Sequence, residues 1–404
     1  MTELNYDGRQ GQKQLSGLRI DEIEVVLLDT TPRLKRRIPT GALAFGDKNS
    51  PVGKPVLVRV RAGGLFGWSQ LRPANPYQGD TAAGTYAALR DFYAPKLIGQ
   101  DATRCVAILR QCETMLPDNP VPQALLDMAL HDLIGRAVGV PVHTLLGGAC
   151  RDQIPMEWSI GLADEETMIR EAATAIERLQ VPYLCVKVGP SHRLDDDVRA
   201  VTRIRQHVGQ HVKLGMDANT SYDLLSATLL LERLADVGIT YFEQPLPVRA
   251  VRDTAVLRSR ARGCAIMADE SVYSTADALA LTAGEAFDVL AHKFIKSGGF
   301  RRGREIAAIA DAAGRSVNCA GTANGVYMEA IAGAHLCAAV PNHIFGAEFV
   351  MGMPVVDEDP LVQNKPLELK NGHSNVPMLP GLGAELDESV LARLTMAREV
   401  FGVK

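Results

Sequence analysis

Five charged residues recur at the ends of short apolar segments in the middle of the chain. They are Lys187, Asp217, Glu243, Asp269 and Lys293, and successive members are about 24 to 30 residues apart. The segments between them have the apolar spacing that is typical of helices. An interval of this size holds one strand and one helix, so the pattern predicts consecutive units of a (β/α)8 barrel. In such a barrel, the carboxyl ends of the strands line one mouth and carry the chemistry.

The three carboxylates predict a metal site. Asp217, Glu243 and Asp269 fall on consecutive predicted strands, so we expect them to converge on one wall of the barrel mouth. A bound divalent cation would relieve the repulsion among them. Oxygen ligands with room for water and substrate favour Mg²⁺ over zinc, with Mn²⁺ as a substitute. The alternative for any one carboxylate is a helix cap or an arginine ion pair, but three at matching strand ends favour the metal.

The two lysines predict acid–base chemistry. Lys187 and Lys293 fall on predicted strands two and six, which face each other across an eight-stranded barrel. A substrate carbon between them could lose a proton to one amine and gain one from the other. Burial and a nearby cation both favour the neutral amine. The metal would stabilise the enediolate formed by proton abstraction α to a carboxylate. We favour this interpretation over a Schiff-base aldolase, which needs a buried lysine but no carboxylate triad.

Two residues near Lys293 are expected to take no part in the chemistry. Lys296 follows the predicted strand and is interpreted as a solvated loop charge. Strand alternation directs His292 away from the barrel axis, so we expect it to be a packing residue.

Length, charge and cysteine content narrow the class of protein. The 404 residues suffice for one barrel of roughly 250 residues and a second, smaller domain. The net charge of −4 indicates neither nucleic acid nor a membrane surface as the main partner. Seven cysteines without a Cys-x-x-Cys pair argue against a disulfide framework and against a thiolate zinc site. With a polar beginning and no long apolar run, these features predict a cytoplasmic protein.

The order of strand-like and helix-like patterns predicts an α/β fold with two domains. In the first domain, the two strand-like segments are expected to form an antiparallel pair, and two irregular stretches, Pro32–Lys54 and Trp68–Asp80, are expected to be long loops. In the tail, a helical pattern covers Glu388 to Val400. The four expected parts are a disordered N-terminus (1–17), an α+β capping domain (18–148), the (β/α)8 barrel (149–350) and a C-terminal segment that packs back on the capping domain (351–404). The capping-domain elements are strands at 18–30 and 55–62 and helices near 81–98, 102–115 and 123–138, and the barrel strands lie at 154–161, 184–188, before 217, 243, 269 and 293, at 316–320 and near 344–348.

The chain resembles the mandelate racemase and muconate lactonising enzyme family of the enolase superfamily, over about residues 18 to 385. The resemblance implies that Asp217, Glu243 and Asp269 bind Mg²⁺ and that Lys187 and Lys293 are the acid–base pair. Predicted strand seven has no histidine for a His-Asp dyad, so the chain is similar to the muconate lactonising subgroup. The segments that carry the resemblance are the run from 125 to 148, Lys-Val-Gly, Asp-Ala-Asn, Phe-Glu-Gln-Pro, Ala-Asp-Glu-Ser and Lys-x-x-Lys-Ser-Gly-Gly.

The chain departs from the subgroup at two places. Cys185 stands where the subgroup has the first lysine of Lys-x-Lys, so the inner wall loses a cation that would depress the pKa of Lys187. Gly-Trp-Ser-Gln (67–70) replaces Gly-Trp-Gly-Glu, which changes a lid loop and the substrate with it. Glu348 matches a position where some relatives keep a glutamate near the substrate, and a surface position is the alternative. Trp158 is expected either to line the pocket or to lie in the core.

The two irregular stretches correspond in the family to lid loops over the barrel mouth. Four cations of the first stretch could contact an anionic substrate. The alternative is that they are solvated surface charges. The cations concerned are Arg33, Lys35, Arg36 and Arg37.

These observations predict an Mg²⁺-dependent isomerase, either a racemase or epimerase or a cycloisomerase, acting on a small carboxylate. An acid dehydratase using the same enediolate is the first alternative, and a catalytically silent protein that binds a carboxylate is the second. The resemblance also implies a homo-oligomer.

Overall fold

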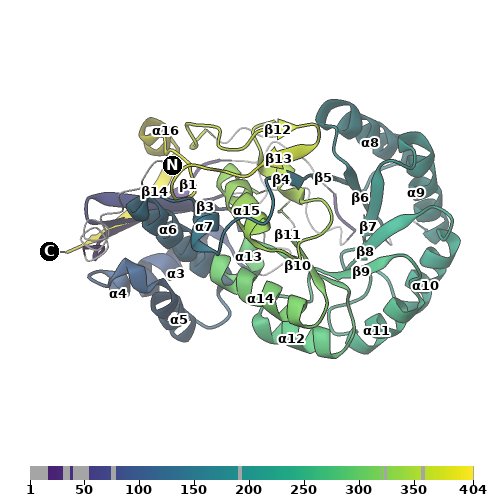
Figure 1. Ribbon diagram of the computed structural model, residues 1–404, viewed down its shortest axis with the longest axis horizontal. Coiled ribbons are helices and arrows are strands. Elements are labelled where there is room, and N and C mark those ends of the chain that lie inside the picture. The colour runs from purple at the N-terminus through teal and green to yellow at the C-terminus, as the bar shows by residue number, and fades with distance from the viewer. Residues whose placement is uncertain are drawn as a thin grey trace, which may run out of the picture.

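The computed structural model describes residues 17–30, 37–39, 54–73, 79–189, 193–319, 321–322, 325–355 and 360–403. The expected disordered segment 1–17 lies outside these residues except for Gly17, and so does most of the first lid loop. A capping domain lies beside a ring of parallel strands that is surrounded by helices (Figure 1). The predicted fold class, an α/β barrel with an α+β cap, is confirmed. Among the described residues, no helix combines the length and apolar character needed to cross a membrane.

The capping domain contains a four-stranded antiparallel sheet in the order β14-β1-β2-β3. The predicted pair is present as β1 (Ile20–Leu28) and β2 (Val56–Ala62). A third strand, β3 (Leu65–Leu71), was not predicted, because we interpreted the chain from Trp68 onward as irregular. Gly63 and Gly64 join β2 to β3 with φ angles of 58° and 79°. Two positive φ angles in a two-residue connection match the twist of a tight hairpin.

The end of the chain completes this sheet. The helix predicted over 388–400 ends early, as α16 (Glu388–Leu394), and β14 (Thr395–Gly402) follows it. β14 pairs antiparallel with β1, from Leu28↔Thr395 to Glu22↔Gly402. The unpaired edge of β1 would expose a row of backbone hydrogen-bonding groups, so strand pairing overrides the local helical pattern.

Helices of the capping domain pack against one face of the sheet. Gly67 lies so close to α6 (Pro120–Val138) that a Cβ there would lie 2.2 Å from the Ala129 carbonyl oxygen. Asp132 on α6 accepts the Trp68 N–H at 3.0 Å and the Leu382 N–H at 2.7 Å, so one carboxylate joins the helix to the sheet and to the C-terminal segment. The remaining capping helices are α3 (Ala82–Ala88), a π-helical turn (Leu89–Tyr93), α4 (Ala94–Leu97), a 3-10 turn (Ala102–Arg104), α5 (Cys105–Met115) and α7 (Val142–Leu145).

Seven parallel strands form the barrel wall in sequence order from β5 to β11. The predicted eighth strand is not regular. Two isolated bridges, Val317↔His343 and Met156↔Ala347, occupy its place between the first and last strands, and a 3-10 turn (Glu348–Gly352) follows. Phe345 has a φ of 64°, which interrupts an extended conformation. The strands are β5 (Glu157–Ile160), β6 (Tyr183–Lys187), β7 (Lys213–Asp217), β8 (Ile239–Glu243), β9 (Ala265–Ala268), β10 (Val289–His292) and β11 (Ser316–Cys319).

Helices cover the outside of the barrel (Figure 1). A short sheet made of β12, β13 and β4 attaches the C-terminal segment to the barrel. The same segment is attached to the cap by β14. The helices are α8 (Glu165–Leu179), α9 (Leu194–Val208), α10 (Leu224–Arg233), α11 (Val251–Arg260), α12 (Thr275–Ala283), α13 (Phe294–Ser297), α14 (Phe300–Ala312) and α15 (Tyr327–Ala339), and the short strands are β4 (Gln153–Pro155), β12 (Leu369–Lys370) and β13 (His373–Asn375).

An aromatic layer fills the interior of the barrel below the mouth. The ring of Tyr241 lies over Gly215, where a Cβ would be 2.1 Å from a ring carbon. The same ring stacks on Phe345 with centroids 5.1 Å apart and an interplanar angle of 27°. The layer also contains Cys185 and Met267. The barrel interior is therefore a packed core and not a pore.

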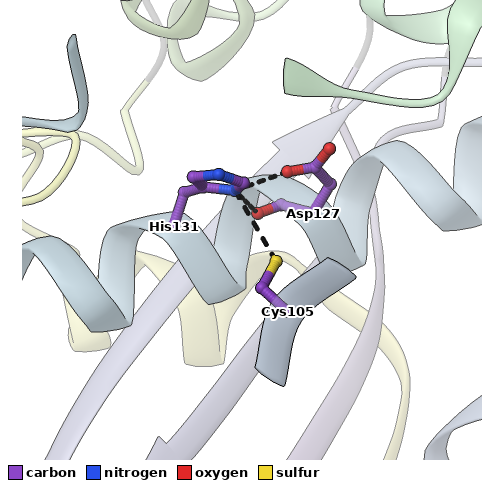
Figure 2. Close-up of side chains that lie close together, drawn as sticks. All are labelled: Cys105, Asp127 and His131. Atoms are coloured by element: carbon purple, nitrogen blue, oxygen red, sulfur yellow. Dashed lines mark hydrogen bonds and ion pairs between the residues drawn. The ribbon is translucent and has the colours of Figure 1, made fainter. Parts of the chain in front are cut away.

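Asp127 links the capping domain to the barrel. Its Oδ2 accepts the Arg301 N–H at 2.9 Å, in the first turn of α14. The neighbouring Cys105 and His131 complete a small polar cluster between α5 and α6 (Figure 2).

A pair of histidines joins α7 to α15 at the same boundary. His335 accepts the His143 N–H on Nδ1 at 3.2 Å, and its Nε2 lies 3.3 Å from the Leu382 carbonyl oxygen. In the neutral form, Nδ1 accepts this backbone N–H and Nε2 donates to the carbonyl oxygen, so both ring nitrogens are satisfied. Burial lowers the pKa of His335 to about 3.

We expect His335 to make the protein sensitive to acid. Its folded-state pKa of about 3 lies below the ordinary value of 6.5, so between these pH values the unfolded chain binds a proton that the native protein does not. Stability is therefore complete above pH 6.5 and falls as the pH decreases. The thermal midpoint should fall from pH 7.5 to pH 5 in the wild type and fall less in His335→Gln. His207→Gln, at an exposed position, should keep the wild-type dependence; equal slopes in all three proteins would contradict the prediction.

Candidate active site

All five charged residues singled out in the sequence lie together at the carboxyl ends of neighbouring strands, and each is buried. Lys187 on β6 is the register partner of Asp217 on β7, and Asp217 is the register partner of Glu243 on β8. Asp269 directly follows β9, and Lys293 directly follows β10. Around the mouth, the order is one amine, three carboxylates and a second amine.

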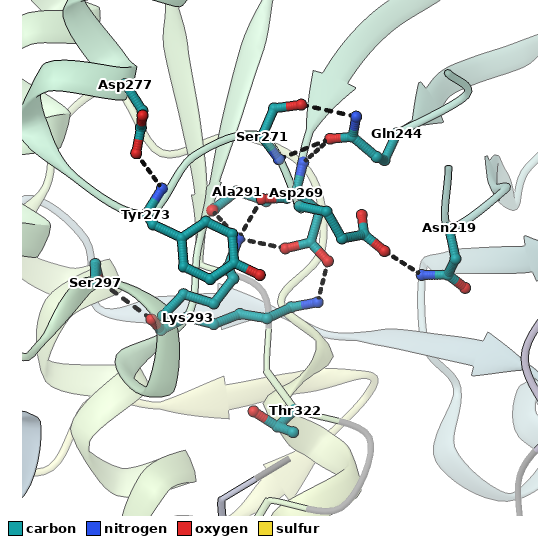
Figure 3. Close-up of polar contacts among 12 residues, drawn as sticks. Asn219, Gln244, Asp269, Ser271, Tyr273, Asp277, Ala291, Lys293, Ser297 and Thr322 are labelled. Atoms are coloured by element: carbon teal, nitrogen blue, oxygen red, sulfur yellow. Dashed lines mark hydrogen bonds and ion pairs between the residues drawn. The ribbon is translucent and has the colours of Figure 1, made fainter. Parts of the chain in front are cut away.

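Each amine of this group contacts a carboxylate. Lys187 Nζ pairs with Asp217 Oδ2, and Lys293 Nζ donates to Asp269 Oδ2 at 2.7 Å. Figure 3 shows Lys293 and Asp269 pointing toward each other beneath the mouth. Lys187 and Lys293 therefore lie at the two ends of the carboxylate row.

Lys296 is not the solvated loop charge that we expected. It is only 1% exposed, and its Nζ contacts Asp269 Oδ1 and donates to the carbonyl oxygens of Asp269 at 2.6 Å and Ala291 at 3.1 Å. The prediction was wrong because α13 begins directly after β10, and one helical turn returns position 296 to the side of Asp269. The amine also lies 5.6 Å from the ring centroid of Tyr273.

The three carboxylates have different electrostatic surroundings. Burial alone would raise the pKa of Asp269, but Lys293 and Lys296 outweigh it and hold that pKa below its usual range. Burial raises the pKa of Glu243 well above its usual value, and the charges of Asp217 and Asp269 raise it further. Glu243 Oε1 is buried without a hydrogen-bond partner among the described residues. An unpartnered oxygen between two other carboxylates fits a divalent cation with oxygen ligands.

Polar residues just after the strands hold these carboxylates in place, and Figure 3 shows the contacts of Gln244. Asn219 donates its backbone N–H to Asp217 Oδ1 at 2.8 Å. Gln244 Oε1 accepts the N–H groups of Asp269 at 3.0 Å and Ser271 at 3.1 Å. Asn219 and Gln244 have φ angles of 42° and 33°, so the chain turns sharply after β7 and β8. Such conformations persist where the surrounding structure imposes them, and they are common at functional sites.

Cys185 lies on the same face of β6 as Lys187, one layer deeper in the barrel. Its sulfur and the carboxylate oxygens of Glu157 and Glu348 all lie within 4.8 Å of one another. Burial, followed by the nearby Glu157, raises the pKa of the Cys185 thiol well above its usual value. Burial, followed by Glu348, does the same for the pKa of Glu157. A neutral thiol and two carboxyl groups therefore occupy the place where the subgroup has a lysine.

Three further expectations can be compared with the structure. Glu348 is 6% exposed and faces Cys185, so the surface alternative is wrong. Trp158 does not line the pocket, because its Nε1 donates to Glu171 Oε1 on α8 at 2.8 Å, outside the barrel. His292 packs on Phe294 with ring centroids 5.1 Å apart, which confirms its packing role.

Part of the first lid loop reaches the barrel mouth. The Arg37 carbonyl oxygen accepts the Leu162 N–H at 3.0 Å, just beyond β5. Pro39 lies so close to Gly189, beyond β6, that a Cβ on Gly189 would be 2.7 Å from the proline. The side chain of Arg37 is exposed, and Arg33, Lys35 and Arg36 lie outside the described residues.

Several residues of the site were missed in the sequence. Asn219 and Gln244 stand inside the motifs Asp-Ala-Asn and Phe-Glu-Gln-Pro, and strand alternation could have placed Glu157 on the inner face. Glu329 had no such signal. It accepts from Thr322 Oγ1 at 2.7 Å, and burial raises its pKa to about 7, against the opposing charges of Lys293 and Arg72.

We expect Lys296→Met to destabilise the protein by about 3–5 kcal/mol, because it leaves the buried Asp269 with one fewer counter-charge. Urea unfolding followed by circular dichroism measures this change. Lys213→Met is the matched control, since Lys213 is exposed at the start of β7. A loss no larger than that of the control would show that Lys296 makes no net contribution to stability.

Known proteins share the two-part organisation of this chain. Residues 24–147 match the family described as "Mandelate racemase / muconate lactonizing enzyme, N-terminal domain", and residues 167–390 match "Enolase C-terminal domain-like". Muconate cycloisomerase 1 of Rhodococcus opacus is 32% identical over 377 residues, which cover 92% of this chain and 97% of that protein.

Solved structures extend the similarity to the whole fold. Muconate lactonizing enzyme from Pseudomonas fluorescens, complexed with muconolactone, has a TM-score of 0.86 at 26% identity and covers 94% of this chain and 99% of its own. N-succinyl Arg/Lys racemase from Bacillus cereus has a TM-score of 0.85 at 22% identity and covers 95% and 100%, which shows the fold alone.

Proposed function

Because the chain belongs to the mandelate racemase and muconate lactonizing enzyme family of the enolase superfamily, we propose that it moves a proton at the carbon next to a substrate carboxylate. It is an enzyme of the isomerase class, as its relatives are. Members of the family use a divalent metal and act on small carboxylates. We further propose the roles of individual residues, Mg²⁺ as the metal, and the type of reaction.

One observation carries the proposal: two buried amines bracket three converging carboxylates. Lys187 precedes Asp217 around the ring of strands, and Lys293 follows Asp269. Structural ion pairs alone need no such order. A row of acids with one amine at each end is suited to a substrate that chelates a cation and presents one carbon to both amines.

Asp217, Glu243 and Asp269 would hold Mg²⁺, which would neutralise the charge that develops on the substrate carboxylate. The protein's own groups perform the proton transfers. One lysine takes the proton from the α-carbon as general base, and the other can return a proton to the opposite face. The cap residues near Arg37 and Pro39 reach the mouth and help to exclude water.

Cycloisomerisation is the first candidate reaction. The relatives that are 32% identical include muconate cycloisomerase 1 of Rhodococcus opacus and a chloromuconate cycloisomerase. Racemisation or epimerisation is the second candidate, and the bracketing lysines favour it, because removal and return of a proton on opposite faces inverts the carbon. The neutral thiol of Cys185 and its two carboxyl neighbours would then select the substrate.

We also propose that the protein forms a homo-oligomer and that it is located in the cytoplasm. All seven cysteines are free thiols, which agrees with a reducing compartment.

We expect Lys187→Ala and Lys293→Ala to remove different proton-transfer steps. Proton NMR in D₂O with Mg²⁺ would be recorded for muconates and for N-acylated amino acids. A racemase should exchange the α-proton of both enantiomers, and each variant should retain exchange with one enantiomer only. A cycloisomerase should place deuterium in the lactone alone, and one of the two variants should lose product formation by about 10²-fold or more. Unchanged rates in both variants would contradict the assigned roles.

We expect Glu243→Gln to weaken Mg²⁺ binding by more than about 100-fold, because even outer-shell partners of a metal cost 10–100-fold. Isothermal titration calorimetry of the purified protein with MgCl₂ measures this affinity. The control is Glu171→Gln, since Glu171 bonds Trp158 outside the barrel. Equal affinity in the two variants would remove Glu243 from the metal site.

A further inference from the structure

A second group of possible metal ligands lies in the capping domain, away from the barrel mouth. One potential ligand atom each from Cys105, Asp127 and His131 lies within 4.8 Å of the others (Figure 2). Cys105 is the first residue of α5. Asp127 and His131 are four residues apart on α6, so they share one face of that helix.

The cluster has more acceptors than donors. His131 Nδ1 lies 2.9 Å from the Asp127 carbonyl oxygen, 2.5 Å from Asp127 Oδ1 and 3.9 Å from Cys105 Sγ. One nitrogen carries at most one proton, so it cannot serve all three atoms. Asp127 Oδ1 is buried and, beyond its ion pair with His131, has no hydrogen-bond partner among the residues that the structure describes. A cation at this point would satisfy the oxygen and the sulfur together.

We propose that Cys105, Asp127 and His131 bind Zn²⁺. Thiolate sulfur, imidazole nitrogen and carboxylate oxygen are the donors that zinc prefers. With its usual bond lengths, two donors on a tetrahedral zinc ion lie about 3.4–3.6 Å apart. The observed nitrogen–sulfur distance of 3.9 Å is close to this, and a small rotation of Asp127 opens the shorter nitrogen–oxygen distance.

Binding exchanges protons for the metal. Burial alone would lower the pKa of His131, but the charge of Asp127 outweighs it and holds that pKa well above the usual value. Zinc would take the place of protons on His131 Nδ1 and Cys105 Sγ, because neutral imidazole and thiolate are the forms that bind a metal. The His131 side chain is 15% exposed, which leaves a route for the ion and for water as a fourth ligand.

The position of the site gives the ion a structural role. Asp127 Oδ2 already accepts the Arg301 N–H at 2.9 Å, and the His131 ring packs on Phe300 at a centroid distance of 5.3 Å. Phe300 and Arg301 begin α14 of the barrel. Zinc would therefore join α5 to α6 within the cap, next to the contact that Asp127 already makes with the barrel. The absence of a Cys-x-x-Cys pair does not exclude such a site, because the fold supplies the ligands from two helices.

Cobalt gives a direct test, because a thiolate bound to Co²⁺ produces a charge-transfer band in the near ultraviolet, whereas carboxylates at the barrel mouth do not. The full chain, saturated with Mg²⁺, would be titrated with CoCl₂. We expect the band in the wild type, and we expect it to be lost in Cys105→Ser and weakened in His131→Gln. Cys112→Ser is the matched control, since Cys112 is a buried thiol on the same helix, and it should keep the band.

Absence of the band in the wild type, or its survival in Cys105→Ser, would overturn the proposal. A band that disappears in Cys185→Ser would also overturn it, because the metal would then lie in the barrel. Thermal unfolding supplies a second measurement: one equivalent of ZnCl₂ should raise the midpoint of the wild type and of Cys112→Ser but not that of Cys105→Ser. An equal rise in all three proteins would contradict the site.

Discussion

The mutual repulsion of buried carboxylates at the barrel mouth is the constraint on which the rest of the site depends. Asp217 and Glu243 are register partners on adjoining strands, and Asp269 is on the next strand, so the barrel geometry itself forces them together. Three buried amines, from Lys187, Lys293 and Lys296, oppose them. An unpaired charge in this interior would cost several kcal/mol, so the amines and the carboxylates compensate one another. The proposed proton transfers and the proposed metal site both depend on this balance of charge.

The surrounding fold makes this charge arrangement precise. Tyr241, seated on Gly215, closes the barrel directly below the charged layer, so the side chains above it have few alternative positions. Asn219 and Gln244 have left-handed backbone conformations just after β7 and β8. Asn219 donates its N–H to Asp217, and Gln244 accepts the N–H of Asp269, so both residues fix the ends of the strands. The cap adds residues near Pro39 over the same strands. Rigid strands therefore supply the positions of the charged residues, and the cap and the deeper layer around Cys185 are the parts that we propose to select the substrate.

The barrel and the five charged positions could be predicted from the sequence, because strand–helix periodicity is local and repeats several times. The sequence did not predict elements whose structure depends on a distant part of the chain. Thr395–Gly402 has a helical pattern but pairs with β1, and the segment before Glu348 lacks regular pairing because Phe345 turns there. Lys296 was misjudged because the helical turn after β10 could not be foreseen. The contacts of Trp158 with Glu171, and of Cys105 with His131, likewise join separate elements.

The place of β1 between β2 and β14 has a consequence for how the protein is made. Among the described strands, β1 is the first to be synthesised, and β14, which completes its edge, is the last. Until β14 has been made, one edge of β1 is open to strands of other nascent chains, and the capping sheet cannot reach its final form. The barrel units, whose neighbours are adjacent in sequence, can assemble earlier. Completion of the capping domain would then be limited by the late pairing of β14 with β1, a contact of high sequence separation.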